Sequence, residues 1–131
     1  MLKITYCMRR LPHLSREEFQ TYYRRTHTRV LSPEDAGHLE MRRYVQLHAS
    51  SEEDCDGLDM DRGGEPSFDA IAEIWLDDHD VWEQKWNSEE GRAVLRQLMD
   101  DEKNFVDWSR SVMTCSRELV FIDGPSTPAR R

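Results

Sequence analysis

Two histidines, His27 and His48, are the side chains of this sequence best suited to acid–base chemistry. A histidine has an unperturbed pKa near ~6.5 and therefore takes up and releases protons close to neutral pH. His27 follows Tyr23 by one helical turn on the apolar stripe of a predicted helix. His48 ends the alternating stretch 41–48, where it shares one strand face with Arg42, Tyr44 and Gln46. Each pattern also fits a structural role, as a hydrogen-bonded core histidine or as part of a solvated strand face.

Other polar and aromatic side chains would complete such a site. Groups able to donate hydrogen bonds to a developing oxyanion or enolate belong to Tyr23, Tyr44 and Gln46. Asp69 and Glu73 either orient a histidine tautomer or form salt bridges, for which the candidates are Arg9, Arg42 and Arg43. Trp75 would provide a flat apolar wall for an aromatic ligand. Trp82 and Trp86 would do the same, although a place in the core suits them better.

Motifs for bound cofactors are absent from the sequence. There is no GxGxxG fingerprint, Gly63-Gly64 precedes neither a lysine nor a helix start, and no GxSxG elbow occurs. The histidines lack HxxxH and facial-triad spacing. The acidic stretch 50–66 does not place glycine and glutamate where an EF-hand loop needs them. We therefore expect neither a cofactor nor a metal ion.

The composition argues against several classes of partner. A net charge of −8 and a pI near 5.1 disfavour nucleic acids and anionic membranes, which bind basic patches. No stretch approaches the ~20 apolar residues of a membrane-spanning helix, and the chain opens on a strand pattern instead of a signal peptide. The cysteines lack CxxC or zinc spacing and suit reduced thiols. We predict a cytoplasmic protein that binds a small molecule.

Alternation and capping signals predict the secondary structure of a single domain. Strands are predicted at 2–9, 41–48, 68–77 and 109–122. A capping box of Ser15 with Glu18 starts a helix that ends near residue 31. A short helix covers 78–86, and Asn87 caps a longer one reaching about residue 107. Glu102 interrupts the apolar stripe of that last helix, and we interpret it as a rim position near solvent in preference to one that faces a cation.

Three segments are predicted to lack regular structure. Residues 34–38 form a short polar connection, 49–67 an acidic loop, and 124–131 a flexible tail. The domain would therefore span residues 1–123, with the acidic loop as an insertion.

The order strand, helix, strand, strand, helix, strand predicts an α+β, ferredoxin-like βαββαβ fold. Its antiparallel sheet would carry the helices on one face. On the bare face we expect Thr5, Cys7, Tyr44, Gln46, His48, Ile71, Glu73 and Trp75. This set is too aromatic for a free surface and too polar for a plain core. We therefore predict a homodimer in which two such sheets face each other and enclose a cavity.

Five segments together resemble the EthD-domain family of the dimeric α/β-barrel superfamily: 6–10, 14–27, 43–48, 68–75 and 101–107. The resemblance extends over about residues 2–121 in the family's order and spacing. The chain departs from the family in the acidic insertion at 50–66 and in Phe68, where the family often has tyrosine before the aspartate. The resemblance implies that His27 and His48 are pocket residues. It also implies activities such as cofactor-free monooxygenase, polyketide cyclase, dehydratase or decarboxylase.

From the residues and the resemblance we predict a cofactor-independent enzyme acting on an aromatic or polyketide-like compound. His27 or His48 would abstract a proton next to a carbonyl, and cyclisation, dehydration or decarboxylation would follow. One alternative is cofactor-free oxygenation, in which the same base makes a carbanion that reduces oxygen. The other is a non-catalytic, ligand-binding accessory protein of an oxygenase.

Overall fold

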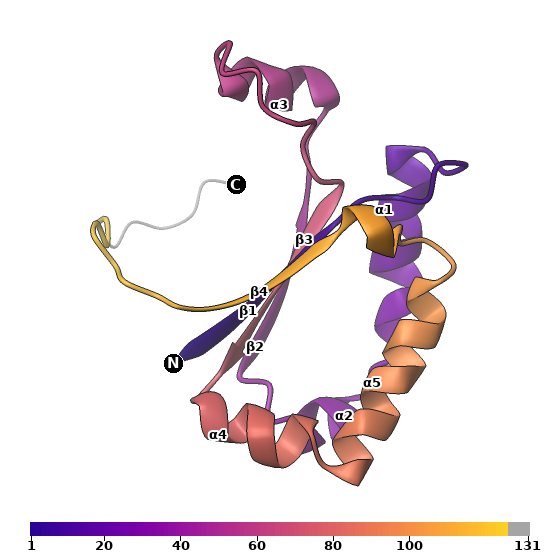
Figure 1. Ribbon diagram of the computed structural model, residues 1–131, viewed down its shortest axis with the longest axis vertical. Helices are drawn as coiled ribbons and strands as arrows, with labels where there is room; N and C mark the ends of the chain where they lie inside the picture. Colours follow the sequence, from indigo (N-terminus) through magenta and orange to yellow (C-terminus); the bar gives the residue numbers. More distant parts are fainter. Residues whose placement is uncertain (126–131) are drawn as a thin grey trace.

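A computed structural model describes residues 1–125 of the chain. Four strands form one antiparallel sheet in the order β2-β3-β1-β4. They are β1 (Leu2–Met8), β2 (Arg43–His48), β3 (Ala70–Leu76) and β4 (Val112–Arg117). Helices α1, α2, α4 and α5 all lie on one side of this sheet, and the other side is bare (Figure 1). The α+β, ferredoxin-like fold is thereby confirmed.

The first helical segment begins as predicted and brings His27 into the interior. Helix α1 (Arg16–Arg25) starts at Ser15, and both hydrogen bonds of the capping box with Glu18 are formed. A single 3-10 turn, η1 (His27–Arg29), continues the helix. Phe19 and Tyr23 of the apolar stripe are buried, and so is His27. The stripe packs on Met8, Ala70, Ala72 and Phe105.

The second helical segment lies on the same side of the sheet as α1 and consists of two parts. Its short first part is α4 (His79–Val81) with the π-helical turn η2 (Trp82–Trp86), and its long part is α5 (Glu89–Glu102). The cap of α5 is Ser88, whose hydroxyl accepts from Gly91 N, so the prediction of Asn87 is wrong by one residue. Helix α5 also ends before the predicted boundary, and a 3-10 turn, η3 (Trp108–Arg110), precedes β4.

Two predicted irregular segments contain helices. Residues expected to form a polar connection fold as α2 (Pro33–His38), since Ser32 is an N-cap and Pro33 suits the first helical position. The predicted acidic loop contains α3 (Glu52–Asp59), in which Ser51 caps a first turn of acidic residues that favour a helix N-terminus. No residue of α3 is buried, and the helix lies beyond the end of the sheet (Figure 1).

The register of β2 overturns the predicted assignment of its two faces. Tyr44 pairs with Ile74, Gln46 with Ala72, and His48 with Ala70. Directly paired residues share a face, and Ala70 and Ala72 are buried beneath the helices. The polar side chains of β2 therefore face the helices, not the bare side. The predicted bare face is correct for the other strands, where Thr5 pairs with Glu73 and Cys7 with Ile71.

The C-terminal part of the described chain has less regular structure than predicted. Strand β4 covers only part of 109–122, and all its residues are exposed. The following apolar residues 119–122 are also exposed, each by 67% or more. Of the predicted tail, residues 126–131 lie outside the described part of the chain. Within residues 1–125 no helix is long and apolar enough to cross a bilayer.

Candidate functional site

A cavity of about 230 Å³ lies between the sheet and the helices, inside one chain. The sheet contributes Ile4, Ala72 and Ile74, and the helical side contributes Trp82, Trp86, Leu95 and Leu98. Four methionines complete the apolar walls: Met8, Met41, Met99 and Met113. Its polar lining consists of Tyr6, Tyr23, His27, Tyr44 and Glu102. The cavity is large enough for a small aromatic molecule.

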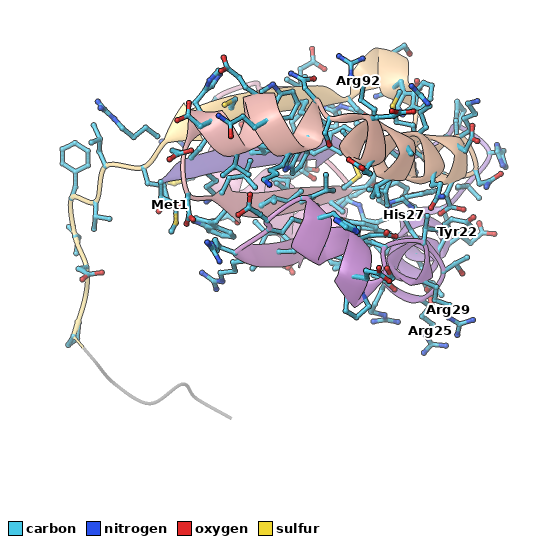
Figure 2. The ribbon with its side chains drawn as sticks, turned by 90° about the horizontal axis from the view of Figure 1, so that it is seen from below. Met1, Tyr22, Arg25, His27, Arg29 and Arg92 are labelled. Carbon is cyan, nitrogen blue, oxygen red and sulfur yellow. The ribbon has the colours of Figure 1, made fainter. Side chains whose placement is uncertain are left out.

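A histidine–carboxylate pair stands at the wall of this cavity. His27 Nδ1 lies 2.7 Å from Asp101 Oδ2, and the imidazole packs against Tyr23 and Phe105 at centroid distances of 5.8 and 5.0 Å. Figure 2 shows His27 between α1 and α5, whereas Arg25 and Arg29 point away from the molecule. The carboxylate favours the tautomer with hydrogen on Nδ1. Nε2 of the neutral ring is then unprotonated and can act as a base.

Asp101 is itself fixed by further donors. The Tyr22 hydroxyl donates to Oδ1 at 2.6 Å, and Asn104 Nδ2 donates to the same oxygen at 3.3 Å. Burial of Asp101 opposes its ionisation, but the hydrogen bonds from Tyr22 and His27 outweigh burial and hold its pKa below the ordinary 3.8. The carboxylate is therefore charged at neutral pH. It stabilises the imidazolium that forms when His27 accepts a proton.

Two tyrosine hydroxyls face each other beside His27. Tyr23 Oη lies 2.7 Å from Tyr44 Oη, and Gln46 Nε2 donates to Tyr44 Oη at 3.4 Å. His48 Nε2 lies 2.8 Å from Gln46 Oε1, which turns the amide nitrogen of Gln46 toward Tyr44. Burial raises the pKa of Tyr23 and of Tyr44 above the ordinary 10.0, so both stay protonated at neutral pH.

Counting hydrogens shows what this tyrosine pair can offer a ligand. Two hydroxyls carry two hydrogens, and one hydrogen forms the bond between Tyr23 and Tyr44. The amide nitrogen of Gln46 is a donor to Tyr44 Oη, so Gln46 accepts neither of the two hydroxyl hydrogens. Within the described residues the second hydrogen has no acceptor, and both tyrosines line the cavity. One O–H group is thus left to bind a carbonyl or enolate oxygen.

Glu102 provides a second carboxylate, and it lines the cavity. The Tyr6 hydroxyl donates to Glu102 Oε1 at 2.7 Å, and Trp108 Nε1 donates to the same oxygen at 3.1 Å. Burial, together with the bond to Glu102, raises the pKa of Tyr6 well above 10.0. Glu102 is half-buried, which agrees with the predicted rim position, and its partners are aromatic N–H and O–H donors instead of a cation.

The predicted site residues divide into two groups. His27, Tyr23 and Tyr44 line the cavity, and Gln46 is hydrogen-bonded to Tyr44. His48 lies outside the lining, at the end of the Tyr23–Tyr44–Gln46 chain, with its ring 5.5 Å from that of Tyr23. Burial and the nearby Arg24 lower the pKa of His48 below 6.5.

The other three predicted residues lie away from this cavity. Asp69 is buried and bonded to Arg10 at 2.6 Å and to Arg16 at 3.0 Å, not to the arginines we expected. Glu73 pairs with Lys3 on the bare sheet face. On that same face, Trp75 lies under the cationic groups of Lys3 and Arg43. Within residues 1–125, no cluster of three or more His, Cys, Asp or Glu could hold a metal ion.

Sequence reasoning missed Asp101 and Tyr6. Asp101 follows Leu98 by three residues, so it occupies the helix face that carries the apolar stripe, and this spacing is the signal that was available. Tyr6 alternates with Ile4 and Met8 on the core face of β1 and reads as ordinary core. Its role emerges only from the position of Glu102 on a distant helix.

Solved structures from several bacteria share this fold. An ethyl tert-butyl ether D (EthD) family protein from Bacillus halodurans superposes with a TM-score of 0.56 at 18% identity, covering 91% of this chain and 99% of that one. A dimeric protein of ferredoxin-like fold from Bacteroides fragilis gives a TM-score of 0.55 at 9% identity, covering 89% and 95%. HapK from Hahella chejuensis gives 0.52 at 10% identity, covering 95% and 100%.

At these identities the likeness shows the fold alone. No curated protein matches the sequence. The model of the EthD domain matches residues 11–109, which is most of the chain, and the protein therefore belongs to the EthD domain family.

Proposed function

We propose that this protein is a cofactor-independent enzyme that removes a proton next to the carbonyl of a small aromatic or polyketide-like compound. The observation that carries the proposal is the His27–Asp101 pair at the wall of an apolar cavity, beside the tyrosine pair. His27 is the base because its ring lines the cavity. His48 is connected to the cavity only through Gln46 and Tyr44.

In the proposed step, His27 Nε2 takes the proton from carbon, and the electron pair of the C–H bond moves onto the carbonyl oxygen. The enolate oxygen accepts the O–H hydrogen left over by Tyr23 and Tyr44. Asp101 stabilises the imidazolium. In a cyclisation, the enolate carbon then attacks a second carbonyl carbon of the same molecule, the electron pair of that C=O bond moves onto its oxygen, and this oxygen takes the proton from His27. In a dehydration, the enolate expels a β-hydroxyl, which leaves as water with the proton from His27. In a decarboxylation, the imidazolium would return its proton to the enolate left by loss of carbon dioxide.

The proton transfer can be tested without the natural substrate. 2-Tetralone is a bicyclic ketone with acidic hydrogens next to its carbonyl, and their exchange in D2O is followed by NMR. We expect the wild-type protein to accelerate exchange and His27→Ala to lose the acceleration. The matched control is His48→Ala, which should keep most of it. Circular dichroism checks that both variants are folded. Equal exchange in the wild type and His27→Ala would refute the proposal.

Two further measurements distinguish the proposed lyase or cyclase from a cofactor-free oxygenase and from an accessory binding protein. A cofactor-free oxygenase would consume oxygen when given an activated ketone, so an oxygen electrode distinguishes it from a lyase or cyclase. An accessory binding protein would bind 2-tetralone in a titration but leave its exchange rate unchanged.

We also propose that a second copy of the chain covers the bare sheet face. Leu47 is 43% and Val112 is 53% exposed there, and Ile71 and Trp75 lie on the same face. Solved proteins of this fold from Bacteroides fragilis and Thermobifida fusca are dimeric. Light scattering after size-exclusion chromatography should show a dimer for the wild type and a monomer for Leu47→Asp combined with Ile71→Asp. A monomeric wild type at micromolar concentration would contradict this.

A further inference from the structure

The ionisable lining of the cavity includes one carboxylate and neither lysine nor arginine within the described residues. Within the described residues, Glu102 is the only Asp, Glu, Lys or Arg that lines it. Both donors to Glu102 end on Oε1, and Oε2 receives no hydrogen bond from the part of the chain that the structure describes. A carboxylate oxygen beside apolar walls is stabilised when a donor reaches it, and the protein itself places none there.

We propose that Glu102 selects the ligand: it accepts a hydrogen bond from a neutral phenolic hydroxyl and rejects carboxylates. This inference rests on the proposed function, because it concerns the same cavity. A phenol supplies an O–H group that forms a charge-assisted bond with Oε2. A carboxylate ligand would place a second negative charge beside Glu102, with no lysine or arginine in the lining to compensate it.

Tyr6 acts as the positioning residue for this contact. Its hydroxyl holds Oε1 from β1, which is distant in sequence from α5, and the indole N–H of Trp108 holds the same oxygen from η3, which follows α5 closely. The carboxylate therefore presents its other oxygen in a fixed direction, as recognition by a single acceptor requires. The tyrosine pair offers a donor, so the ligand would carry both a hydroxyl for Glu102 and a carbonyl for Tyr23 and Tyr44.

The charge pattern also ranks the reactions. A free carboxylic acid is the substrate of a decarboxylase, and this lining repels it. Cyclisation and dehydration need no carboxylate and can start from neutral hydroxylated ketones, which the lining would accept. Glu102 thus assigns the cavity to neutral hydroxylated ketones and to ring closure or loss of water.

Two ligands of nearly the same shape test this assignment. 2-Naphthol is neutral at pH 7, and 2-naphthoate carries one negative charge; isothermal titration calorimetry measures both. A hydrogen bond to a charged group corresponds to about tenfold or more in affinity. We expect the wild-type protein to bind 2-naphthol at least about tenfold more tightly than 2-naphthoate. Glu102→Gln should weaken the binding of 2-naphthol, strengthen the binding of 2-naphthoate and bring the ratio of the two affinities close to one.

The matched control is Glu90→Gln, the same chemical change at an exposed position of α5, which should leave the ratio as in the wild type. Equal binding of the two ligands by the wild type overturns the inference, and this measurement needs no variant. An unchanged ratio in folded Glu102→Gln also overturns it, as does failure of both ligands to bind. The proposed base is tested separately, because 2-tetralone has neither a hydroxyl nor a carboxylate and reports only on proton transfer by His27.

Discussion

Replacing Asp101 by asparagine removes the charge beside His27 while keeping an oxygen that can accept from Nδ1. In the native protein the two groups lie 2.7 Å apart, and their side chains are only 10% and 16% exposed. Two opposite charges ~4 Å apart attract by about 4 kcal/mol at an effective dielectric of ~20. This attraction exists only after His27 has accepted a proton. Its loss therefore raises the free energy of the state in which the ketone has been deprotonated.

Part of that attraction is offset in the variant, since the remaining hydrogen bond and some solvent stabilise the imidazolium. We take about 2–3 kcal/mol as the net loss, in the range found for hydrogen bonds to charged groups. At 1.36 kcal/mol per tenfold, the exchange of 2-tetralone hydrogens should slow by roughly 30- to 150-fold. Initial rates measured by NMR at one pH, with 2-tetralone well below saturation, give this ratio directly.

The control is Asp100→Asn, which makes the same chemical change one residue earlier. Asp100 is exposed and bonds only Lys103 among the described residues, so its replacement should alter the exchange rate little. If Asp101→Asn also stayed within about threefold of the wild type, a change typical of surface charges, Asp101 would not activate His27. The assignment of His27 as a base supported by a carboxylate would then be wrong.

Three further predictions concern stability. The hydrogen bonds of Asp69 to two arginines outweigh its burial and lower its pKa below 3.8, so its stabilisation is complete above that pH and is lost as pH falls through the lowered pKa. Asp69→Asn should cost about 2–3 kcal/mol in urea unfolding at pH 7, and this cost should decrease as the pH falls through the lowered pKa, whereas the exposed Asp77→Asn should cost far less at pH 7. A Cβ at Gly91 would lie 2.8 Å from the carbonyl oxygen of Trp86, so Gly91→Ala should cost about 1–3 kcal/mol of stability and lower the thermal midpoint. Gly57→Ala, at an open helical position, should raise the thermal midpoint. Burial raises the pKa of all four tyrosines above 10.0, so their contribution to stability is complete below pH 10 and is lost as the pH rises through the raised pKa values. Absorbance at 295 nm should therefore show no ionisation step near pH 10 in the folded protein, and such a step would contradict the raised pKa values.

Local signals in the sequence were sufficient for the order of the four strands and of the two main helical segments. The Ser15 capping box and the alternating strands depend on contacts within a few residues, and these are the contacts that sequence patterns record. The helices α2 and α3 were missed because their composition is polar. Their caps, Ser32 and Ser51, were nevertheless present and gave the better indication.

The site was only partly predictable, for a reason visible in β2. Alternation separates the two faces of a strand but does not say which face is inside. Val45 and Leu47 made the wrong face look like the core, and the deciding fact is the pairing of Gln46 with Ala72. Small alanines leave space on the helix side, and Tyr44 fills it by bonding Tyr23. The partnership of His27 with Asp101 joins residues 74 positions apart, which no local pattern records.

The four methionines of the cavity have a consequence for oxidative damage. Met99 and Met113 are 50% and 58% exposed, whereas Met8 is buried, so oxidants in solution reach the first two. Conversion of a thioether to a sulfoxide makes a flexible apolar group polar. Sulfoxides at Met99 and Met113 would make one wall of the cavity polar and weaken the binding of an apolar ring. Methionine sulfoxide reductases would restore the apolar wall. The wall that adapts most easily to ligand shape is thus also the wall of the cavity that peroxide reaches most easily.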